Sequence, residues 1–189
     1  MLAQRNVVAG SRPAVNARIA AISRPQRASR SVVAVKAMKV GEALKDSAEY
    51  YRVLKTSEGK TVTLASFEGK PLVLFFYPKA ATPGCTKEAC KFRDEYSAFT
   101  EAGAAVFGIS SDSPAENKAW ADANRLPFPL LTDPSSILRK TFGIKGDLLG
   151  LLPGRQTFVF NKAGKCVLSF NDQMNAEQHV AEALKALKA

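Results

Sequence analysis

The chain has 189 residues, of which 46% are hydrophobic, so it is long enough to bury the core of one domain. Its longest apolar runs, such as Leu72 to Tyr77, have the length of a strand, whereas a membrane-spanning helix needs about 20 consecutive apolar residues. No membrane span is therefore expected. The formal net charge of +10 would suit a nucleic-acid-binding protein, unless that charge is confined to one segment.

Most of the net positive charge comes from residues 1–37. That segment contains six arginines and Lys36 but no acidic residue, which leaves residues 38–189 with 20 basic and 17 acidic residues and a net charge of +3. It is rich in Ser and Ala and is interrupted by Pro13 and Pro25. This composition is typical of an organelle transit peptide, and a basic arm that grips nucleic acid is the alternative.

We predict a transit peptide over 1–37 and one folded domain over 38–189. Val35-Lys36-Ala37 resembles a plastid processing site, which makes Met38 the first residue of the mature protein. The predicted location is therefore the chloroplast, and the mitochondrion is the alternative because both organelles use Arg-rich signals. No second apolar or twin-arginine signal follows the basic segment, which favours the stroma over the thylakoid. No nucleic-acid partner is expected.

The chain has three cysteines and one histidine. This number of cysteines does not make a disulfide framework of the secreted kind. A zinc site needs about four ligands in spaced pairs, and the sequence has no such pattern. His179 lies in a C-terminal helical pattern beside Val180, so we interpret it as a surface or half-buried residue. We expect no metal and no cofactor, and the cysteines must act without an imidazole.

From residue 40 onward, strand-like runs alternate with helix-like ones, which predicts an α/β fold. Thr61 to Leu64 is a short candidate strand. Leu72 to Tyr77 shows no polar alternation, so it is expected to be a central strand buried on both faces. Pro78 ends this strand, because proline cannot donate to the ladder.

A helix is predicted directly after this strand. Thr82 is a good N-cap and Pro83 suits the first helical position, so Cys85 falls in the first turn. Apolar residues then recur every three or four positions, which marks the buried side of the helix. These residues are Cys85, Ala89, Phe92, Tyr96 and Phe99.

The remaining elements continue the alternation of strands and helices. Ser113-Pro114-Ala115-Glu116 is a capping box that opens another helix. Asn175 is expected to cap a closing helix whose inner face carries Val180, Leu184 and Leu187. The other predicted elements are a buried strand over 104–109, a short strand over 128–131, a short helix over 137–142 and a hairpin formed by 157–160 and 166–170.

Cys85 is the strongest candidate for a reactive group. Free backbone N–H groups and the helix dipole both favour negative charge in the first turn of a helix, so a thiolate is stabilised there. Gly84 leaves room for the sulfur to approach those amides, and Pro78 and Pro83 stiffen the loop. A buried inert cysteine is the alternative, but the Thr-Pro-Gly-Cys order favours a nucleophile.

Pro78-x-x-x-Thr82-x-x-Cys85 resembles the active-site pattern of the peroxiredoxins. With Cys90 five positions later, the chain resembles their peroxiredoxin Q branch, also called bacterioferritin comigratory protein, from about Lys39 to the C-terminus. The resemblance includes Phe75-Phe76-Tyr77-Pro78 and Phe92-Arg93-Asp94. It implies a thioredoxin-like fold, in which helices flank a central mixed β-sheet, with the N-terminal extension of this family.

The resemblance also implies the chemistry. The Cys85 thiolate would attack hydrogen peroxide or an alkyl or lipid hydroperoxide and become a sulfenic acid. Thr82 and an arginine would stabilise the negative charge on the leaving oxygen. By its position before the hairpin, that arginine matches Arg155, with Arg93 and Arg125 as competitors. Pro78 and Gly84 would help to position the substrate.

Cys90 is implied as the resolving cysteine, which forms a Cys85–Cys90 disulfide that thioredoxin then reduces. On an ideal helix, Cα atoms five residues apart are separated by roughly 8.7 Å, and a disulfide needs about 4.4–6.8 Å. We therefore predict that oxidation unwinds the first turns of the helix. Cys166 shares strand parity with Leu168 and Phe170, so it is expected to be a dispensable core residue. The alternatives are that Cys90 is an incidental exposed thiol, or that it forms a structural disulfide with Cys166.

Two rival functions remain open on the same fold. A thiol–disulfide oxidoreductase normally has a Cys-x-x-Cys spacing, which differs from the Cys85-x4-Cys90 spacing seen here. A redox-sensing binding protein would use oxidation of Cys85 to switch a partner surface and would not need Thr82 or Arg155. The family resemblance favours a monomer, because both reacting cysteines lie in one predicted helix.

Overall fold

The computed structural model describes residues 37–147 and 150–189. The predicted transit peptide over 1–37 lies, apart from Ala37, outside the described residues, and it stays a prediction. Among the described residues, no helix combines the length and the apolar character needed to cross a membrane.

The centre of the structure is a seven-stranded mixed sheet. Its strand order is β2-β1-β5-β4-β3-β6-β7. β3 runs parallel to β4 on one side and antiparallel to β6 on the other. The strands are β1 (Leu54–Thr56), β2 (Thr61–Val62), β3 (Leu72–Phe76), β4 (Ala105–Ser110), β5 (Leu130–Thr132), β6 (Gln156–Phe160) and β7 (Cys166–Phe170).

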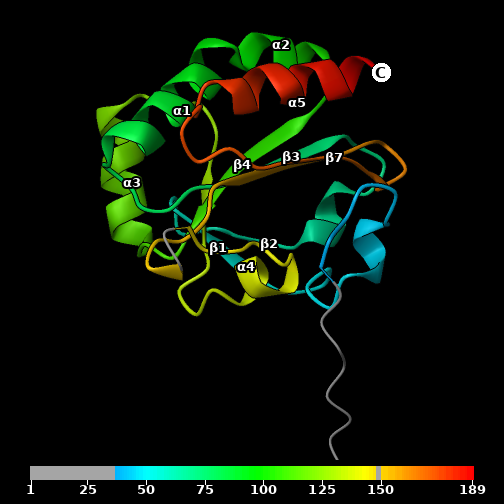
Figure 1. Cartoon of the computed structure of the whole chain (residues 1–189), viewed down its shortest axis with the longest axis horizontal. Coiled ribbons are helices and arrows are strands. Elements are labelled where there is room, and N and C mark those ends of the chain that lie inside the picture. The colour runs from blue at the N-terminus through cyan, green and yellow to red at the C-terminus, as the bar shows by residue number, and fades with distance from the viewer. Residues whose placement is uncertain (1–36, 148–149) are drawn as a thin grey trace, which may run out of the picture. The chain divides into compact units, whose positions relative to one another are not determined.

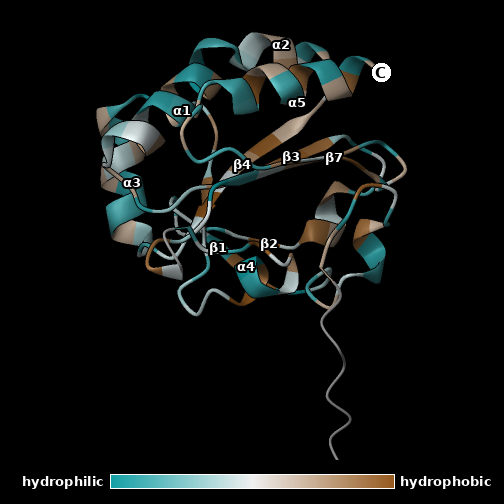
Figure 2. Cartoon of the chain, in the orientation of Figure 1, coloured by the Kyte–Doolittle hydropathy of each residue, from teal (hydrophilic) through white to brown (hydrophobic). Residues whose placement is uncertain are grey.

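Helices lie on both sides of this sheet. Figure 1 shows α1, α2 and α5 together on one side and α4 on the other. Figure 2 shows brown, hydrophobic strands between helices that carry many teal, hydrophilic residues. The helices are α1 (Pro83–Asp94), α2 (Tyr96–Glu101), α3 (Pro114–Ala123), α4 (Ile137–Thr141) and α5 (Gln178–Lys188), with short 3-10 helices at Leu44–Asp46 and Leu64–Phe67.

Strand β3 is buried on both faces, as the sequence predicts. Its side chains alternate between two hydrophobic clusters, because successive residues of a strand point to opposite faces. Val73 and Phe75 join Cys85 in the α1-side cluster, which also contains Ala89, Phe92, Phe99, Trp120 and Val180. Leu72, Leu74 and Phe76 join the α4-side cluster, which also contains Leu44, Tyr50, Leu64, Leu138, Phe142 and Cys166.

Several predicted boundaries differ from the structure. The strand expected over 61–64 covers only Thr61–Val62, and β1 was not predicted. The helix that begins at Pro83 breaks at Glu95, where the backbone leaves the helical conformation, and restarts as α2. Asn175 does not cap the last helix, whose N-cap is Glu177. The Asn175 side chain donates instead to the Asp172 carboxylate, and this hydrogen bond closes a turn before the helix.

The capping box of α3 is confirmed. The Ser113 hydroxyl accepts a hydrogen bond from the backbone N–H of Glu116 (3.2 Å), and the Glu116 carboxylate accepts one from the backbone N–H of Ser113 (2.9 Å). This reciprocal arrangement satisfies donors that a helix start otherwise leaves free. Just before α3, the Asp112 carboxylate accepts a hydrogen bond from the Ala80 N–H at 2.8 Å, which links this end of α3 to the loop between β3 and α1.

Candidate active site

Cys85 lies in the first turn of α1, at the carboxyl end of β3, and its side chain is buried in the α1-side cluster. Thr82 occupies the N-cap position, but its hydroxyl makes no capping bond. It donates to the Lys79 carbonyl at 3.0 Å instead. The Thr82 side chain therefore leaves the first amides of α1 available to a negative charge near Cys85.

Arg155 lies directly before β6, the strand next to β3, and its side chain reaches this sulfur. Its Nη2 donates to Cys85 Sγ at 3.5 Å. The backbone of Arg155 is held at both of its polar groups, because its N–H donates to Gln173 (3.0 Å) and its carbonyl accepts from Asn171 (2.7 Å). A guanidinium that is fixed in this way can stabilise negative charge without reorganising during a reaction.

The two competing arginines lie elsewhere. Arg93 donates to the Asn124 carbonyl at 2.8 Å and pairs with Asp94. Arg125 is exposed, in a left-handed conformation directly after α3. Of the three arginines that the sequence singles out, the structure brings only Arg155 into contact with Cys85 in its described part.

Arg139 is a second buried cation that the sequence analysis missed. Its guanidinium donates to the Tyr77 carbonyl (2.8 Å) and to the Gly154 carbonyl. These contacts tie the end of β3, just before Pro78, to the segment that carries Arg155. Burial lowers the pKa of Arg139, against the raising effect of Asp133 and Cys85.

Two glycines make the approach of Arg155 possible. A Cβ atom on Gly84 would lie 3.3 Å from Arg155 Nη2, which is tight for a guanidinium that must keep its position. A Cβ atom on Gly154 would lie 1.9 Å from the Lys145 carbonyl oxygen, a contact that the backbone cannot accommodate. Gly84 therefore leaves room for the Arg155 guanidinium, in addition to its place at the start of the helix. Pro78 lies half-buried where the loop begins.

Glu88 is fully buried three residues after Cys85, and the sequence analysis missed it. One carboxylate oxygen, Oε2, pairs with Arg155 Nη1. The other, Oε1, has no hydrogen-bond partner among the described residues. Burial raises the pKa of Glu88 to about 8, although the charge of Arg155 opposes the shift.

His179 is fully buried, so its interpretation as a surface or half-buried residue is wrong. Its Nδ1 lies 2.8 Å from the Thr157 hydroxyl and 3.6 Å from Glu88 Oε1. Its Nε2 lies 2.8 Å from the Asp172 carbonyl. Burial lowers the pKa of His179 to about 4. The sequence signal for burial of His179 was its place next to Val180 in the helical pattern, because the neighbour of a buried residue on α5 can also face the sheet.

Replacing Glu88 with Gln is expected to stabilise the reduced protein more at pH 8 than at pH 5. The pKa of this carboxyl group is about 8 in the folded chain, against an ordinary value of 4.5. The native carboxyl group therefore contributes stability that is complete below its unfolded pKa and is lost as the pH rises toward its folded pKa. Glutamine has no such proton to lose. Urea unfolding at both pH values tests this, and an equal stability difference at each pH would contradict it.

The three cysteines are all free. Cys90 is half-buried in α1, and its thiol donates to Asn124 Oδ1 at 3.7 Å. Cys166 begins β7 in the α4-side cluster, across the sheet from Cys85, which confirms it as a core residue. Burial raises the pKa of the Cys166 thiol to about 11, so this thiol stays protonated and weakly nucleophilic at neutral pH.

The pattern of the AhpC/TSA family matches residues 44–169. A chloroplastic peroxiredoxin Q of Populus jackii is 52% identical over 136 residues, which cover 72% of this chain and 64% of that protein. The chain belongs to the AhpC/TSA family, in its peroxiredoxin Q branch. It thus spans somewhat less than two thirds of the length of that peroxiredoxin Q relative.

Solved structures of peroxiredoxins share the fold. Peroxidoxin BcpB of Mycobacterium tuberculosis is 36% identical, with a TM-score of 0.70, over 80% of this chain and 97% of that one. Bacterioferritin comigratory protein of Xanthomonas campestris is 29% identical, with a TM-score of 0.67, over 79% of this chain and 96% of that one. The predicted thioredoxin-like fold, with its mixed sheet between helices, is confirmed.

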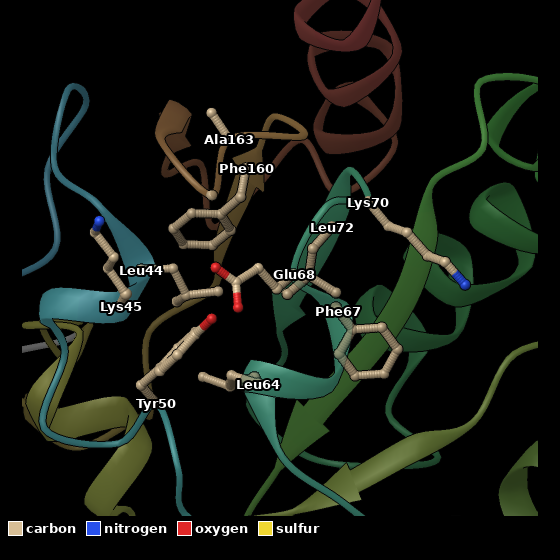
Figure 3. A pocket seen from close by; sticks show the side chains of 11 residues that line it. Leu44, Lys45, Tyr50, Leu64, Phe67, Glu68, Lys70, Leu72, Phe160 and Ala163 are labelled. Carbon is tan, nitrogen blue, oxygen red and sulfur yellow. The ribbon is translucent and has the colours of Figure 1, made fainter.

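A separate small cavity lies at the opposite end of β3 from Cys85 in this peroxiredoxin. Figure 3 shows the Tyr50 hydroxyl and the Glu68 carboxylate pointing toward each other inside it, between Leu44 and Phe160. Its volume of about 20 Å³ suits a single water molecule. Burial, with a further contribution from Glu68, raises the pKa of Tyr50. A cavity of this size at the amino end of β3 has no part in chemistry at Cys85.

Proposed function

We propose that the chain is a thiol peroxidase in which Cys85 is the peroxidatic cysteine. The observation that carries this proposal is the contact of 3.5 Å between Arg155 Nη2 and Cys85 Sγ in the buried first turn of α1. An inert core cysteine has no need of a buried guanidinium, whose desolvation is costly. A thiolate that reacts with a peroxide needs a fixed positive charge in this place.

The reaction begins when the Cys85 thiolate attacks the terminal oxygen of a hydroperoxide. An S–O bond forms and the O–O bond breaks, so the sulfur is oxidised to a sulfenic acid while the peroxide is reduced. The departing oxygen takes up a proton and leaves as water or an alcohol. Arg155 and the open amides at the start of α1 stabilise the charge that moves from sulfur to oxygen. The Thr82 hydroxyl, beside this turn, would orient the incoming peroxide.

Cys90 then attacks the sulfenic acid, which gives a Cys85–Cys90 disulfide and water. Both cysteines belong to the intact helix α1, so the first turns must unwind before the sulfurs can meet. Unwinding releases two contacts with α3: the Trp120 Nε1 bond to Thr86 Oγ1 (3.3 Å) and the Cys90 bond to Asn124. The existing break at Glu95 lets these turns open while α2 stays in place.

We infer that thioredoxin reduces this disulfide and that the substrates include hydrogen peroxide and alkyl or lipid hydroperoxides. The solved Xanthomonas protein is described in terms of its alkyl peroxide reduction activity. A hollow of about 450 Å³ beside the loop before α1 exposes mainly apolar atoms, from Ala80, Ala81, Ala119, Trp120 and Ala123, and Lys79, Asp112 and Glu116 also line it. Such a surface suits the hydrocarbon part of an organic hydroperoxide.

We place the protein in the chloroplast, in the stroma or associated with the thylakoid, as a monomer. The Populus relative is named as chloroplastic, and residues 1–37 have the composition of a transit peptide. The two cysteines proposed to react lie in one helix, so the cycle does not need a second chain. No nucleic acid is part of this function, because the folded domain has a net charge of only +3.

One kinetic experiment tests the proposed function against its rivals. The reduced protein is mixed with hydrogen peroxide, thioredoxin and a system that keeps thioredoxin reduced, and peroxide consumption is followed. Sustained consumption is expected, and Cys85→Ser should lose it completely. Reduction of insulin disulfides without peroxide turnover would identify a thiol–disulfide oxidoreductase. A single round of oxidation that thioredoxin cannot reverse would identify a sensor.

A further inference from the structure

In the buried pocket around Cys85, two acidic groups face the one guanidinium of Arg155. The Cys85 thiolate and the Glu88 carboxylate both face the guanidinium of Arg155, which carries a single charge. Burial disfavours the charged form of Arg155, but the negative charges of Glu88 and Cys85 outweigh that effect and its pKa is raised. If both acids were ionised, two negative charges would share the guanidinium of Arg155 away from water, which is costly.

His179 supplies the place for a compensating proton. Its Nε2 faces the Asp172 carbonyl, which can only accept, so this nitrogen always carries a hydrogen. Its Nδ1 is then the nitrogen that can gain or lose a proton, and it lies 3.6 Å from the unpartnered Glu88 Oε1. The Thr157 hydroxyl, 2.8 Å from Nδ1, can donate to a bare nitrogen or accept from a protonated one.

We propose that Glu88 and His179 hold one proton between them, and that this proton keeps the pocket around Cys85 and Arg155 free of excess negative charge. His179 is thus a positioning residue of the peroxide reaction, acting through Glu88 on Arg155. The inference rests on the proposed peroxidase function. While the proton is present, Arg155 directs its charge toward the Cys85 thiolate. Once the proton leaves, the Glu88 carboxylate competes with the thiolate for that guanidinium.

The other groups that face this pocket keep their charge between pH 7 and 10. Burial raises the pKa of Tyr77, so this phenol directly after β3 stays neutral. Hydrogen bonds from Asn175 lower the pKa of Asp172, which stays ionised. The guanidinium groups stay protonated. Besides Cys85 itself on α1, the groups around the pair in the described part of the chain are Tyr77 directly after β3, Arg139 on α4, Arg155 before β6 and Asp172 before α5.

The rate constant for peroxide attack should therefore fall at alkaline pH, although a cysteine thiolate alone gives a rate that rises and then levels off. Stopped-flow mixing of the reduced protein with hydrogen peroxide from pH 6 to pH 10 measures it, with Trp120, the only tryptophan, as the fluorophore. We expect the rate constant to decrease by on the order of tenfold above about pH 8. Glu88→Gln, which cannot ionise, should lose this decrease, and the exposed control Glu101→Gln should keep it.

His179→Asn distinguishes a positioning role from a merely structural one. An asparagine amide can donate to the Glu88 carboxylate and favours its ionised form, so the alkaline decrease should move to lower pH. A structural role would reduce the rate constant by the same factor at every pH. A native rate constant that stays level to pH 10, or an unchanged decrease in Glu88→Gln, would overturn the proposal.

A spectroscopic measurement keeps the test independent of peroxidase activity. If the proton is on Glu88 at pH 7, the infrared spectrum should show the band of a protonated carboxyl group, and this band should disappear in Glu88→Gln. If the proton is on His179, the imidazole should be protonated at pH 7. Nitrogen-15 NMR resolves the latter directly, because the chain has one histidine. Either result supports the shared proton. An ionised Glu88 beside a neutral His179 at pH 7 would contradict it, even if peroxide turnover is normal.

Discussion

Replacing Cys90 with Ser is expected to stop peroxide turnover after about one peroxide per chain. Cys85 and Arg155 remain in contact in this variant, so the first attack should proceed at nearly the native rate. The sulfenic acid then has no thiol partner within its own helix and cannot become the disulfide that thioredoxin reduces. Peroxide consumption with the thioredoxin system, combined with mass spectrometry of the stalled protein, measures both parts.

Cys166→Ser is the matched control for this experiment. Cys166 lies in the α4-side cluster, on the opposite face of the sheet from Cys85, and its thiol has no role in the proposed cycle. Turnover in this variant should equal that of the native protein. Full turnover in Cys90→Ser, or a block in Cys166→Ser, would show that another thiol resolves the sulfenic acid.

Replacing Arg155 with Met should slow the attack on peroxide by about 10²–10³-fold, the usual loss when a fixed group that stabilises transition-state charge is removed. The native guanidinium contacts Cys85 Sγ and faces the place where the leaving oxygen develops charge. Methionine fills part of the same volume but carries no charge. The second-order rate constant with hydrogen peroxide is the measurement, and a circular dichroism spectrum confirms that the variant is folded.

Arg125→Met serves as the control, because Arg125 was a competitor for the same role and is exposed after α3. Its rate constant should stay within about twofold of the native value, as expected for a surface charge. Equal losses in both variants would mean that the net positive charge, rather than the position of one guanidinium, speeds the reaction.

The central strand and the start of α1 could be predicted because short-range patterns determine them. Continuous apolar residues over 72–77 indicated burial on both faces, and the order Thr82-Pro83-Gly84-Cys85 indicated a helix start. The break at Glu95 could not be seen, since the apolar spacing continues through it from Phe92 to Tyr96. Strand β1 was missed because three residues are too few to show an alternating pattern.

The contacts around Cys85 were harder to predict than the cysteine itself. Glu88 lies about one helical turn from Cys85, so the sequence could have predicted that the two share a helix face. Its partner Arg155 comes from a distant segment, whose position depends on the sheet. His179 is separated from Glu88 by nearly half of the chain. The packing of α5 against β6, β7 and α1 brings these two polar residues together, and no spacing rule predicts such a contact.

The proposed cycle requires that the turn which presents Cys85 also opens. In the reduced protein, Phe92 stacks on Phe75 (4.4 Å between ring centroids) and Trp120 bonds to Thr86. These contacts hold α1 closed for attack and must partly be lost for Cys90 to reach Cys85. A more stable α1 should therefore attack peroxide well but recycle slowly.

The most direct test is a crystal structure of the protein after oxidation with one equivalent of hydrogen peroxide. We predict a Cys85–Cys90 disulfide with the first turns of α1 unwound and the Trp120 bond to Thr86 broken. A structure in which the two sulfurs are bridged while residues 85–95 keep the backbone conformation of the reduced protein would contradict this account.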